Sequence, residues 1–239
     1  MRLQMTVQRS LRSEIEKLQK QNGYTLRRLS ELSGINHGHL SDILRSNRPM
    51  TVGQLDALAV VFGQAPGWLY ELYTDECFTK ERVSRPRVTR YLIRCAEIGR
   101  LDCIQQVVSK LLDDRKNLEI LFSVAERLFE NGQGKEAVPF YEYVVENEKD
   151  NHSDRFVISQ YRLFRASLGT NAEENWKAVI RFEAYRSRLP EHYQLDGLLQ
   201  LVNVCFMLEK WQEVEKYADE MRSLVKKVYQ DELRKRKSN

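Results

Sequence analysis

The sequence predicts an all-α protein that consists of a five-helix domain followed by a series of antiparallel helical pairs. Apolar residues recur at three- and four-residue spacings through most of the chain, and no sustained alternation of the kind that predicts a strand is present. The 239 residues include only 5 prolines and 11 glycines, whereas helix-forming Leu, Glu, Arg and Lys are frequent. Both observations favour helices, and the chain is long enough for two domains.

The first predicted helix ends near residues 22–23. Its apolar stripe consists of Val7, Leu11, Ile15 and Leu18. Asn22 or Gly23 can then adopt the left-handed conformation that terminates a helix. Thr25 follows as the expected N-cap of a second helix.

Gly34 separates the second helix from a third, for which Asn36 is the expected N-cap. The side chains expected to face inward are Leu26, Leu29 and Leu32 in the second helix and Leu40, Ile43 and Leu44 in the third. Ser30 provides the small side chain that is needed where two helices cross closely. This order of apolar, small and glycine positions predicts a helix-turn-helix.

Two further helices complete the first predicted domain, residues 1–78. Thr51 and Gln54 form a capping box for the fourth helix, VGQLDALAVVFG, and Pro66 is expected to open the fifth, GWLYELY. The next residues, TKERVSRPRVTR at 79–90, are polar and contain Pro86, so we interpret them as a linker. The basic residues of this linker before Arg90 either contact a DNA backbone or remain solvated.

A second pattern follows the helix-turn-helix. It is formed by Leu55, Leu58, Ala59, Phe62, Gly63 and Leu69. With both patterns, residues 7–78 resemble the DNA-binding domain of the phage-repressor-like XRE/Cro family, and the resemblance implies a five-helix fold that binds double-stranded DNA. Many members of the family have glutamine at the start of the second helix, where this chain has Leu26-Arg27. They also have a Gln or Ser pair at the start of the third helix, where this chain has His37-Gly38. The base preferences of the family therefore cannot be assigned to this chain.

Helix geometry selects the candidate DNA contacts. With the apolar stripe of the third helix buried, a rotation of about 100° per residue points Gly38, Asp42 and Arg45 toward the major groove. Arg45 can pair with guanine or phosphate, and Asp42 can accept a hydrogen bond from cytosine. The arginines expected to bind DNA phosphates are Arg27, Arg28 and Arg48. The full set of candidate DNA-binding residues is Arg27, Arg28, His37, Gly38, His39, Ser41, Asp42, Arg45 and Arg48.

These assignments have structural alternatives. Asp42 and Arg45 are spaced to form a surface ion pair, and the arginines can be ordinary surface residues. His37 and His39 form an HxH pattern, but two such residues diverge by about 200° on a helix. No further ligand follows at metal-site spacing, so we expect no metal site.

Positive charge is concentrated in the N-terminal part of the chain. The net charge is +5 over residues 1–50, −4 over 51–78, +5 over 79–100 and −2 over 101–239. This distribution is typical of a basic nucleic-acid-binding domain joined to a near-neutral domain of a different kind. Alternatively, the charges belong to an ordinary solvated surface.

Other classes of function have little support. The sequence contains no GxSxG, no HExxH and no phosphate-binding glycine loop, so we expect no catalytic residues and no cofactor. Cys77, Cys95, Cys103 and Cys205 form no CxxC pair and are expected to be reduced and buried. No apolar stretch approaches the roughly 20 residues that span a bilayer, and the first residues lack the apolar segment of a signal peptide. We therefore expect a cytoplasmic protein without membrane contact.

Residues 91–239 are predicted to form about four antiparallel helical pairs. Apolar stripes run through eight segments between residues 89 and 229, with breaks at Gly99, Gly132, Gly169 and Lys210. The best match to the tetratricopeptide repeat is formed by Leu121, Val124, Ala125, Leu128, Ala137 and Tyr141. This resemblance implies a short right-handed solenoid.

The first helix of each pair lines the concave side of such a solenoid. Offsets from the packing positions predict a peptide-binding set that consists of Glu126, Phe129, Gln160, Leu163, Asp196, Leu199, Asn203 and Phe206. Asn203 lies in the apolar run LLQLVNVCFML, and an asparagine side chain can bond both backbone groups of an extended peptide. Alternatively, Asn203 is a satisfied amide between helices.

An XRE-type head with a tetratricopeptide-like body resembles the peptide-pheromone-sensing regulators of Gram-positive bacteria and their phages, the Rap/Rgg/NprR/PlcR/PrgX group. The resemblance implies a bacterial or phage-encoded homodimer that binds an inverted-repeat operator and is controlled through its solenoid by a short signalling peptide. About four helical pairs are fewer than is usual in that group. The alternative hypothesis is a helical-repeat adaptor or antitoxin-like partner whose DNA contact is secondary.

Overall fold

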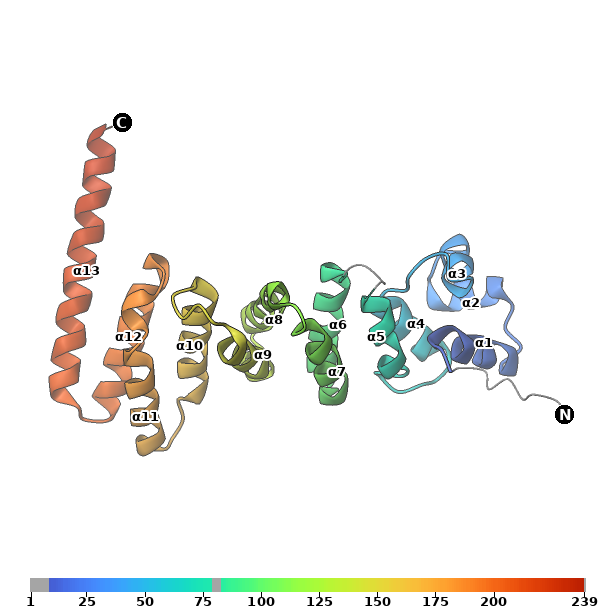
Figure 1. Ribbon diagram of the computed structural model, residues 1–239, viewed down its shortest axis with the longest axis horizontal. Coiled ribbons are helices and arrows are strands. Elements are labelled where there is room, and N and C mark those ends of the chain that lie inside the picture. The colour runs from blue at the N-terminus through green and yellow to red at the C-terminus, as the bar shows by residue number, and fades with distance from the viewer. Residues whose placement is uncertain (1–8, 79–82, 239) are drawn as a thin grey trace. The chain divides into compact units, whose positions relative to one another are not determined.

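The computed structural model describes residues 9–78 and 83–238 and is built from helices (Figure 1). These residues form thirteen α-helices and two short 3-10 helices, and their only β pairing is an isolated bridge between Phe78 and Val83. The prediction of an all-α protein is confirmed. The chain divides into two compact units, residues 1–114 and 115–239, and each is described by itself.

The first unit contains seven helices among its described residues. They are α1 (Leu11–Gln21), α2 (Leu26–Ser33), α3 (His37–Leu44), α4 (Val52–Val61), α5 (Tyr70–Cys77), α6 (Arg85–Glu97) and α7 (Leu101–Leu111). Val7, which was predicted to belong to the first apolar stripe, lies outside the described residues.

Three of the predicted helix starts are confirmed by their capping contacts. The Thr25 hydroxyl accepts a hydrogen bond from the Arg28 amide, and the Asn36 side chain accepts from the amides of Gly38 and His39. Thr51 and Gln54 form the expected reciprocal capping box of α4. The N-cap of α1, which was not predicted, is Ser10.

The fifth helix does not begin at Pro66. The segment before α5 is a turn in which Gly67 and Leu69 have φ angles of 83° and 58°, and these left-handed conformations are incompatible with a continuing helix. The helix therefore starts at Tyr70. Pro66 lies in the turn instead of opening the helix.

The predicted linker at residues 79–90 differs from the structure. Residues 79–82 lie outside the described part of the chain, but α6 already begins at Arg85. Pro86 stands in the first turn of α6, where its missing amide hydrogen costs nothing, so it starts a helix instead of interrupting one. Val88 is fully buried, which a solvated connector would not allow.

Helix α6 packs on α4 and α5 within the first unit. The ring of Tyr91 lies 5.3 Å from that of Tyr70 and 4.9 Å from that of Tyr73, and the Tyr91 hydroxyl donates to the Tyr70 carbonyl at 2.6 Å. Arg94 of α6 forms an ion pair with Asp56 of α4 at 2.9 Å. The first predicted helical pair, α6 and α7, thus belongs to the same compact unit as α1 to α5.

The second unit continues the series of helices. Its elements are a 3-10 helix η1 (Arg115–Asn117), α8 (Leu118–Glu130), α9 (Gly134–Asn147), α10 (Asp154–Ser167), α11 (Ala172–Glu183), a 3-10 helix η2 (Arg186–Arg188), α12 (Glu191–Met207) and α13 (Trp211–Ser238). Neighbours along the chain pack on one another, as α8 does on α9 and α12 on α13. The eight segments predicted between residues 89 and 229 correspond to α6 through α13.

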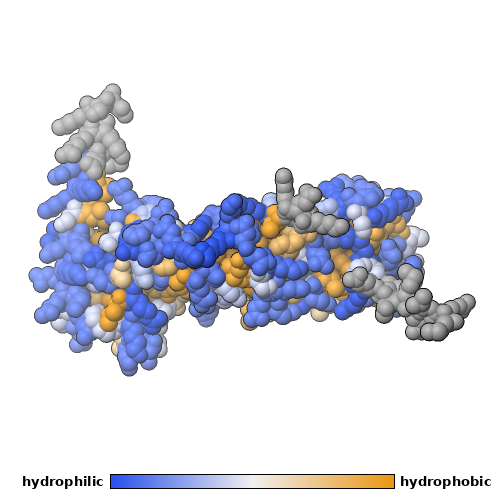
Figure 2. Space-filling view, viewed as in Figure 1, coloured by the Kyte–Doolittle hydropathy of each residue, from blue (hydrophilic) through white to orange (hydrophobic). Residues whose placement is uncertain are grey.

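The core of the second unit lies between these helices. Phe164 and Phe182 stack with their ring centroids 4.7 Å apart, and Tyr161 lies 5.3 Å from Phe182. Hydrophilic residues cover most of the face seen in Figure 2, and hydrophobic residues show between the helices. No helix in the described part of the chain combines the length and the apolar character needed to cross a membrane.

All four cysteines are free and buried, as predicted. Burial raises the pKa of the Cys77 thiol to about 12 and that of the Cys205 thiol to about 11. These thiols therefore remain protonated at neutral pH and are poor nucleophiles.

Glu183 connects the end of α11 to η2 and α13. Its carboxylate accepts hydrogen bonds from Arg186 at 2.8 Å, Lys216 at 2.6 Å and the Tyr217 hydroxyl at 2.7 Å. Burial alone would raise the pKa of Glu183, but these three donors outweigh it and lower the pKa to about 2.

Replacement of Glu183 by glutamine should remove a pH-dependent contribution to stability. Because the carboxylate has a pKa of about 2 in the folded chain and an ordinary value of 4.5, it stabilises the fold above pH 4.5 and loses this effect as the pH falls to about 2. The difference in unfolding free energy between wild type and Glu183→Gln should therefore shrink across that interval when urea unfolding is followed by circular dichroism. Glu191→Gln, at an exposed position of α12, serves as the control. A difference that does not change with pH would contradict the assignment.

Candidate functional site

Helix α3 presents a polar face to solvent. Leu40 and Ile43 are fully buried, and this orientation leaves the other side of the helix free. The exposed residues of this face are His37, Gly38, His39, Asp42 and Arg45, and Ser41 is half-buried beside them. The prediction that Gly38, Asp42 and Arg45 face away from the core is confirmed.

The turn before α3 fixes where this face begins. Gly34 has a φ of 68°, and the Ser30 hydroxyl donates to the Ile35 carbonyl at 2.6 Å. Ser30 thus does more than allow close packing, because it also satisfies a carbonyl of the turn. Leu32, which was predicted to face inward, is 42% exposed, so this expectation was wrong. Leu29 alone is fully buried in α2.

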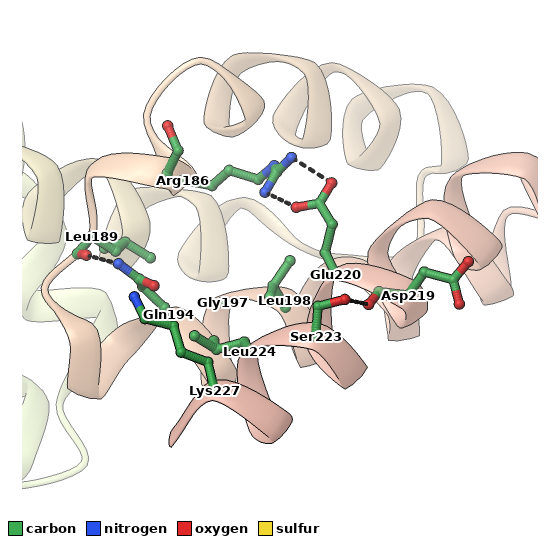
Figure 3. Close-up of a pocket in the computed structure, with 11 residues that line it drawn as sticks. Arg186, Leu189, Gln194, Gly197, Leu198, Asp219, Glu220, Ser223, Leu224 and Lys227 are labelled. Carbon is green, nitrogen blue, oxygen red and sulfur yellow. Dashed lines mark hydrogen bonds and ion pairs between the residues drawn. The ribbon is translucent and has the colours of Figure 1, made fainter. Parts of the chain in front are cut away.

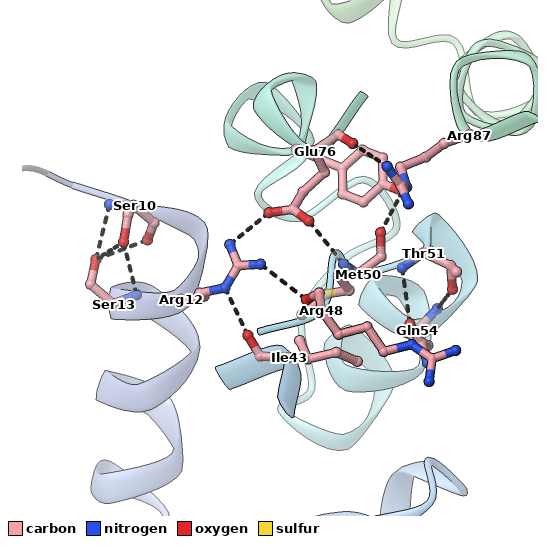
Figure 4. Close-up of polar contacts among 11 residues, drawn as sticks. Ser10, Arg12, Ser13, Ile43, Arg48, Met50, Thr51, Gln54, Glu76 and Arg87 are labelled. Carbon is pink, nitrogen blue, oxygen red and sulfur yellow. Dashed lines mark hydrogen bonds and ion pairs between the residues drawn. The ribbon is translucent and has the colours of Figure 1, made fainter. Parts of the chain in front are cut away.

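Arg12 and Glu76 hold the other end of α3 (Figure 4). The Arg12 guanidinium donates to the Ile43 carbonyl at 2.7 Å and to the Arg48 carbonyl at 3.4 Å, and it forms an ion pair with Glu76 at 2.6 Å. The second carboxylate oxygen of Glu76 accepts from the Met50 amide at 2.8 Å. These contacts connect α1 and α5 to the end of α3 and to the loop that follows it. No local sequence signal predicts the pairing of Arg12 with Glu76, because the two side chains are 64 positions apart.

The arginines around α3 differ in their partners. Arg27 and Arg28 are highly exposed but lie 3.3 Å and 3.5 Å from the carboxylate of Glu31. Within the part of the chain that the structure describes, the side chains of Arg45 and Arg48 form no ion pair. The alternative of an ion pair between Asp42 and Arg45 is therefore not observed.

The loop after α3 is folded back onto that helix. The amides of Asn47 and Arg48 both donate to the Asp42 carbonyl, at 2.9 Å and 3.3 Å, and Ser46 has a left-handed φ of 63°. The backbone at Arg48 is thus positioned by α3 while its side chain remains exposed. Among residues 9–78 and 83–238, no group of three or more His, Cys, Asp or Glu side chains is arranged to hold a metal ion.

In the second unit, three of the predicted peptide-binding residues meet around two arginines that were not predicted. Glu126 accepts two hydrogen bonds from Arg162 at 3.0 Å and 3.1 Å, and the guanidinium of Arg162 lies 3.8 Å above the ring of Phe129. Asp196 lies 3.6 Å from the guanidinium of Arg165. The arginines were missed because long cationic side chains within an amphipathic helix usually indicate its solvated face.

The Glu126 carboxylate is the centre of this cluster. It also accepts hydrogen bonds from the hydroxyls of Tyr141 at 2.5 Å and Tyr193 at 3.3 Å, so α8, α9, α10 and α12 all contribute. Burial alone would raise the pKa of Glu126, but the Arg162 and Tyr141 hydrogen bonds lower it below its ordinary value. Glu126 therefore carries its charge at neutral pH.

Gln160 and Leu163 do not share this surface. They line a separate cavity of about 250 Å³ together with side chains of α9 and α11. The residue of α10 that faces Glu126 is Arg162. The prediction that Gln160 and Leu163 lie on the same face as Glu126 was therefore wrong. The repeat pattern was degenerate here, and an error of one or two residues turns an α-helix by about 100° to 200°.

Leu199, Asn203 and Phe206 lie on one exposed face of α12. Their spacing of four and three residues places them in a single row. Asn203 was expected to lie either on a peptide-binding face or between helices. It is exposed, so the amide is solvated, and the alternative of an amide buried between helices is not observed.

A larger cavity of about 500 Å³ lies between η2, α12 and α13 (Figure 3). Several of its polar groups are already bonded to one another: Arg186 donates to both oxygens of Glu220, at 2.5 Å and 2.9 Å, and Gln194 donates to the Leu189 carbonyl at 2.8 Å. None of the predicted site residues lines it.

Comparison of the chain with family models, with curated proteins and with solved structures gave no match.

Replacement of Glu76 by glutamine should loosen the end of α3. The glutamine cannot pair with the Arg12 charge and leaves a largely buried guanidinium without its counter-ion, which should cost about 2 kcal/mol of local stability. Hydrogen–deuterium exchange of the amides at residues 43–50 should be correspondingly faster. Glu31→Gln is the matched control, because its ion pairs with Arg27 and Arg28 are exposed and should contribute less than about 0.5 kcal/mol. Unchanged exchange in Glu76→Gln would show that the ion pair does not support α3.

Proposed function

We propose that the chain is a sequence-specific DNA-binding transcription regulator of the XRE/Cro type, in which α2 and α3 form a helix-turn-helix. One observation carries the proposal: α3 exposes a continuous polar face while Leu40 and Ile43 are buried on the opposite side. A helix of this kind fits the major groove of DNA. The exposed arginines at the end of α3 and on α2 supply the positive charge that DNA binding requires.

The residues of this face have different proposed roles. Gly38, Asp42 and Arg45 face base edges, since Gly38 allows close approach and Arg45 can form two hydrogen bonds with guanine. His37, His39 and Ser41 flank them as supporting contacts. Arg27, Arg28 and Arg48 bind phosphates and so position the helix without reading sequence.

The second unit is proposed to be a tetratricopeptide-like module that binds a short signalling peptide and controls DNA binding. The proposal is supported by the cluster of Glu126, Phe129 and Asp196 around two arginines and by the exposed row on α12. We further propose that the chain acts as a homodimer on an inverted-repeat operator, because two helices α3 related by twofold symmetry would read two equivalent half-sites.

A second candidate function is that of a protein-interaction adaptor. It is favoured by the exposure of Phe206, Met207 and Trp211, at 59%, 67% and 57%, which is high for large apolar side chains, and the rings of Phe206 and Trp211 lie 5.4 Å apart. In that case the helical body binds another protein and DNA contact is secondary. The two functions differ in whether binding distinguishes one DNA sequence from another.

Selection from random duplex DNA, followed by fluorescence anisotropy, tests the first proposal. The full chain should enrich one sequence, and Arg45→Ala should weaken binding to that sequence at least about tenfold while relaxing preference at one position. Arg48→Ala should instead weaken binding to selected and scrambled DNA alike. It should also make the slope of log affinity against log salt concentration less steep by about 1, which corresponds to the loss of one phosphate contact.

Arg90→Ala provides the control, because Arg90 is an exposed arginine of α6 on the same unit but outside the proposed interface. It should leave the discrimination between selected and scrambled DNA unchanged. Binding that weakens with salt but enriches no sequence would reject the sequence-specific regulator and favour the adaptor.

A further inference from the structure

A cavity of about 480 Å³ lies beside the Arg162 cluster of the second unit. Phe129, Val138, Tyr141 and Ala166 contribute to its walls, and they give the cavity an apolar side. Three cationic side chains also line it, namely Lys135, Arg162 and Arg165, whereas Glu136 is the only acidic residue in the lining. A cavity of this size and polarity suits a ligand that combines negative charge with an apolar group.

The two arginines of this cavity differ in how their donors are used. Arg162 is nine-tenths buried and donates to both oxygens of Glu126, so its charge is neutralised. Arg165 is 36% exposed, and its nearest acid is Asp196 at 3.6 Å, which is too long for a hydrogen bond. Among the described residues no carboxylate lies within hydrogen-bond distance of the Arg165 guanidinium, and its other polar neighbour is the Tyr161 hydroxyl.

Arg165 is nevertheless held in a defined place. Its guanidinium lies 5.8 Å from the ring centroid of Phe129 and 6.0 Å from that of Tyr161. Asp196 is already engaged, because it accepts a hydrogen bond from the Tyr161 hydroxyl. A cation that lies beside two rings and has no carboxylate within hydrogen-bond distance is suited to bind an incoming anion.

We infer that this cavity binds the terminal carboxylate of a short peptide, with Arg165 as its main partner and Lys135 as a second cation. This inference rests on the proposed peptide-binding function of the second unit. A guanidinium matches a planar carboxylate with two parallel hydrogen bonds. A free phosphate would leave the apolar walls at Phe129 and Val138 unused, whereas the last side chain of a peptide would occupy them.

The same geometry indicates where the rest of the peptide lies. Asp196, next to Arg165, is followed on α12 by the exposed row of Leu199, Asn203 and Phe206. Ten helical residues from Asp196 to Phe206 extend about 15 Å. An extended peptide of about five residues has this length, and its earlier side chains would contact the apolar residues of the row.

Two pools of synthetic pentapeptides, each randomised at every position, test the inference. One pool has a free terminal carboxylate and the other a terminal amide. After incubation with the full chain, retained peptides are separated by size exclusion and quantified by mass spectrometry. The free-carboxylate pool should be retained at least about tenfold more than the amidated pool, which is the usual effect of removing a charge-assisted pair of hydrogen bonds.

Variants then assign the effect to the cavity. Arg165→Gln should reduce retention of the free-carboxylate pool to the level of the amidated pool, and Lys135→Gln should reduce it by about threefold. Lys177→Gln is the control, since Lys177 is an exposed cation of α11 that does not line the cavity. Circular dichroism checks that each variant is folded, and the comparison of the two pools on the wild-type chain requires no variant.

The outcomes separate this inference from the function on which it rests. Equal retention of both pools, or an amidated pool enriched in Asp and Glu, would overturn recognition of the terminal carboxylate while leaving peptide binding intact. Continued discrimination between the pools by Arg165→Gln would overturn the role of Arg165. If the wild-type chain retains neither pool, the proposed peptide-binding function fails as well.

Discussion

The contact between Arg12 and Glu76 is the interaction on which the exposed helix of the first unit depends. The last carbonyls of a helix have no partner within that helix, and here Arg12 donates to the carbonyl of Ile43 at the end of α3. Glu76 fixes the guanidinium and also accepts from the Met50 amide in the following loop. The Glu76 carbonyl in turn accepts from Arg87 at 2.7 Å, so α6 joins the same network. The orientation of the polar face of α3 is therefore set by four other segments of the unit and not by α3 alone.

The second unit uses a similar arrangement at Glu126. Apolar packing between helices is not directional, and it tolerates small rotations of one helix against another. Hydrogen bonds from Arg162, Tyr141 and Tyr193 to one carboxylate have fixed geometry, and they come from three different helices. Such a network costs desolvation free energy, and its benefit is a defined arrangement of the side chains on this face. That arrangement places the Phe129 ring beneath Arg162 and beside Arg165.

The features that the sequence could predict are local ones. Thr25, Asn36 and Thr51 were identified as N-caps because a cap depends on residues within one turn. The interpretation of Pro86 as a linker residue failed because a proline serves equally well in a loop and in the first turn of a helix, and only the packing of Val88 distinguishes them. The offset on α10 failed because Arg162, a charged residue, lies at a buried position, which hydrophobic periodicity cannot detect. The partners of Arg12 and Arg162 lie far along the chain, and pairing at that distance depends on tertiary structure.

The arginines of this chain differ in whether a carboxylate within the fold already neutralises them, and this difference separates the arginines that stabilise the fold from those that are proposed to bind a ligand. Arg12, Arg162 and Arg186 each have a carboxylate within hydrogen-bond distance, so an external anion would have to displace a partner to reach them. Arg27 and Arg28 are intermediate, because both share the exposed carboxylate of Glu31, and their attraction to a phosphate is reduced by that neighbour. Arg45 and Arg48 have no such competitor among the described residues, and Arg165 has one, Asp196, at 3.6 Å. Free energy of binding is gained most readily where a charge is held in place without being neutralised. By this criterion the end of α3 should contribute more to the proposed DNA binding than the arginines of α2, and Arg165 should contribute more to the proposed anion binding than its neighbour Arg162.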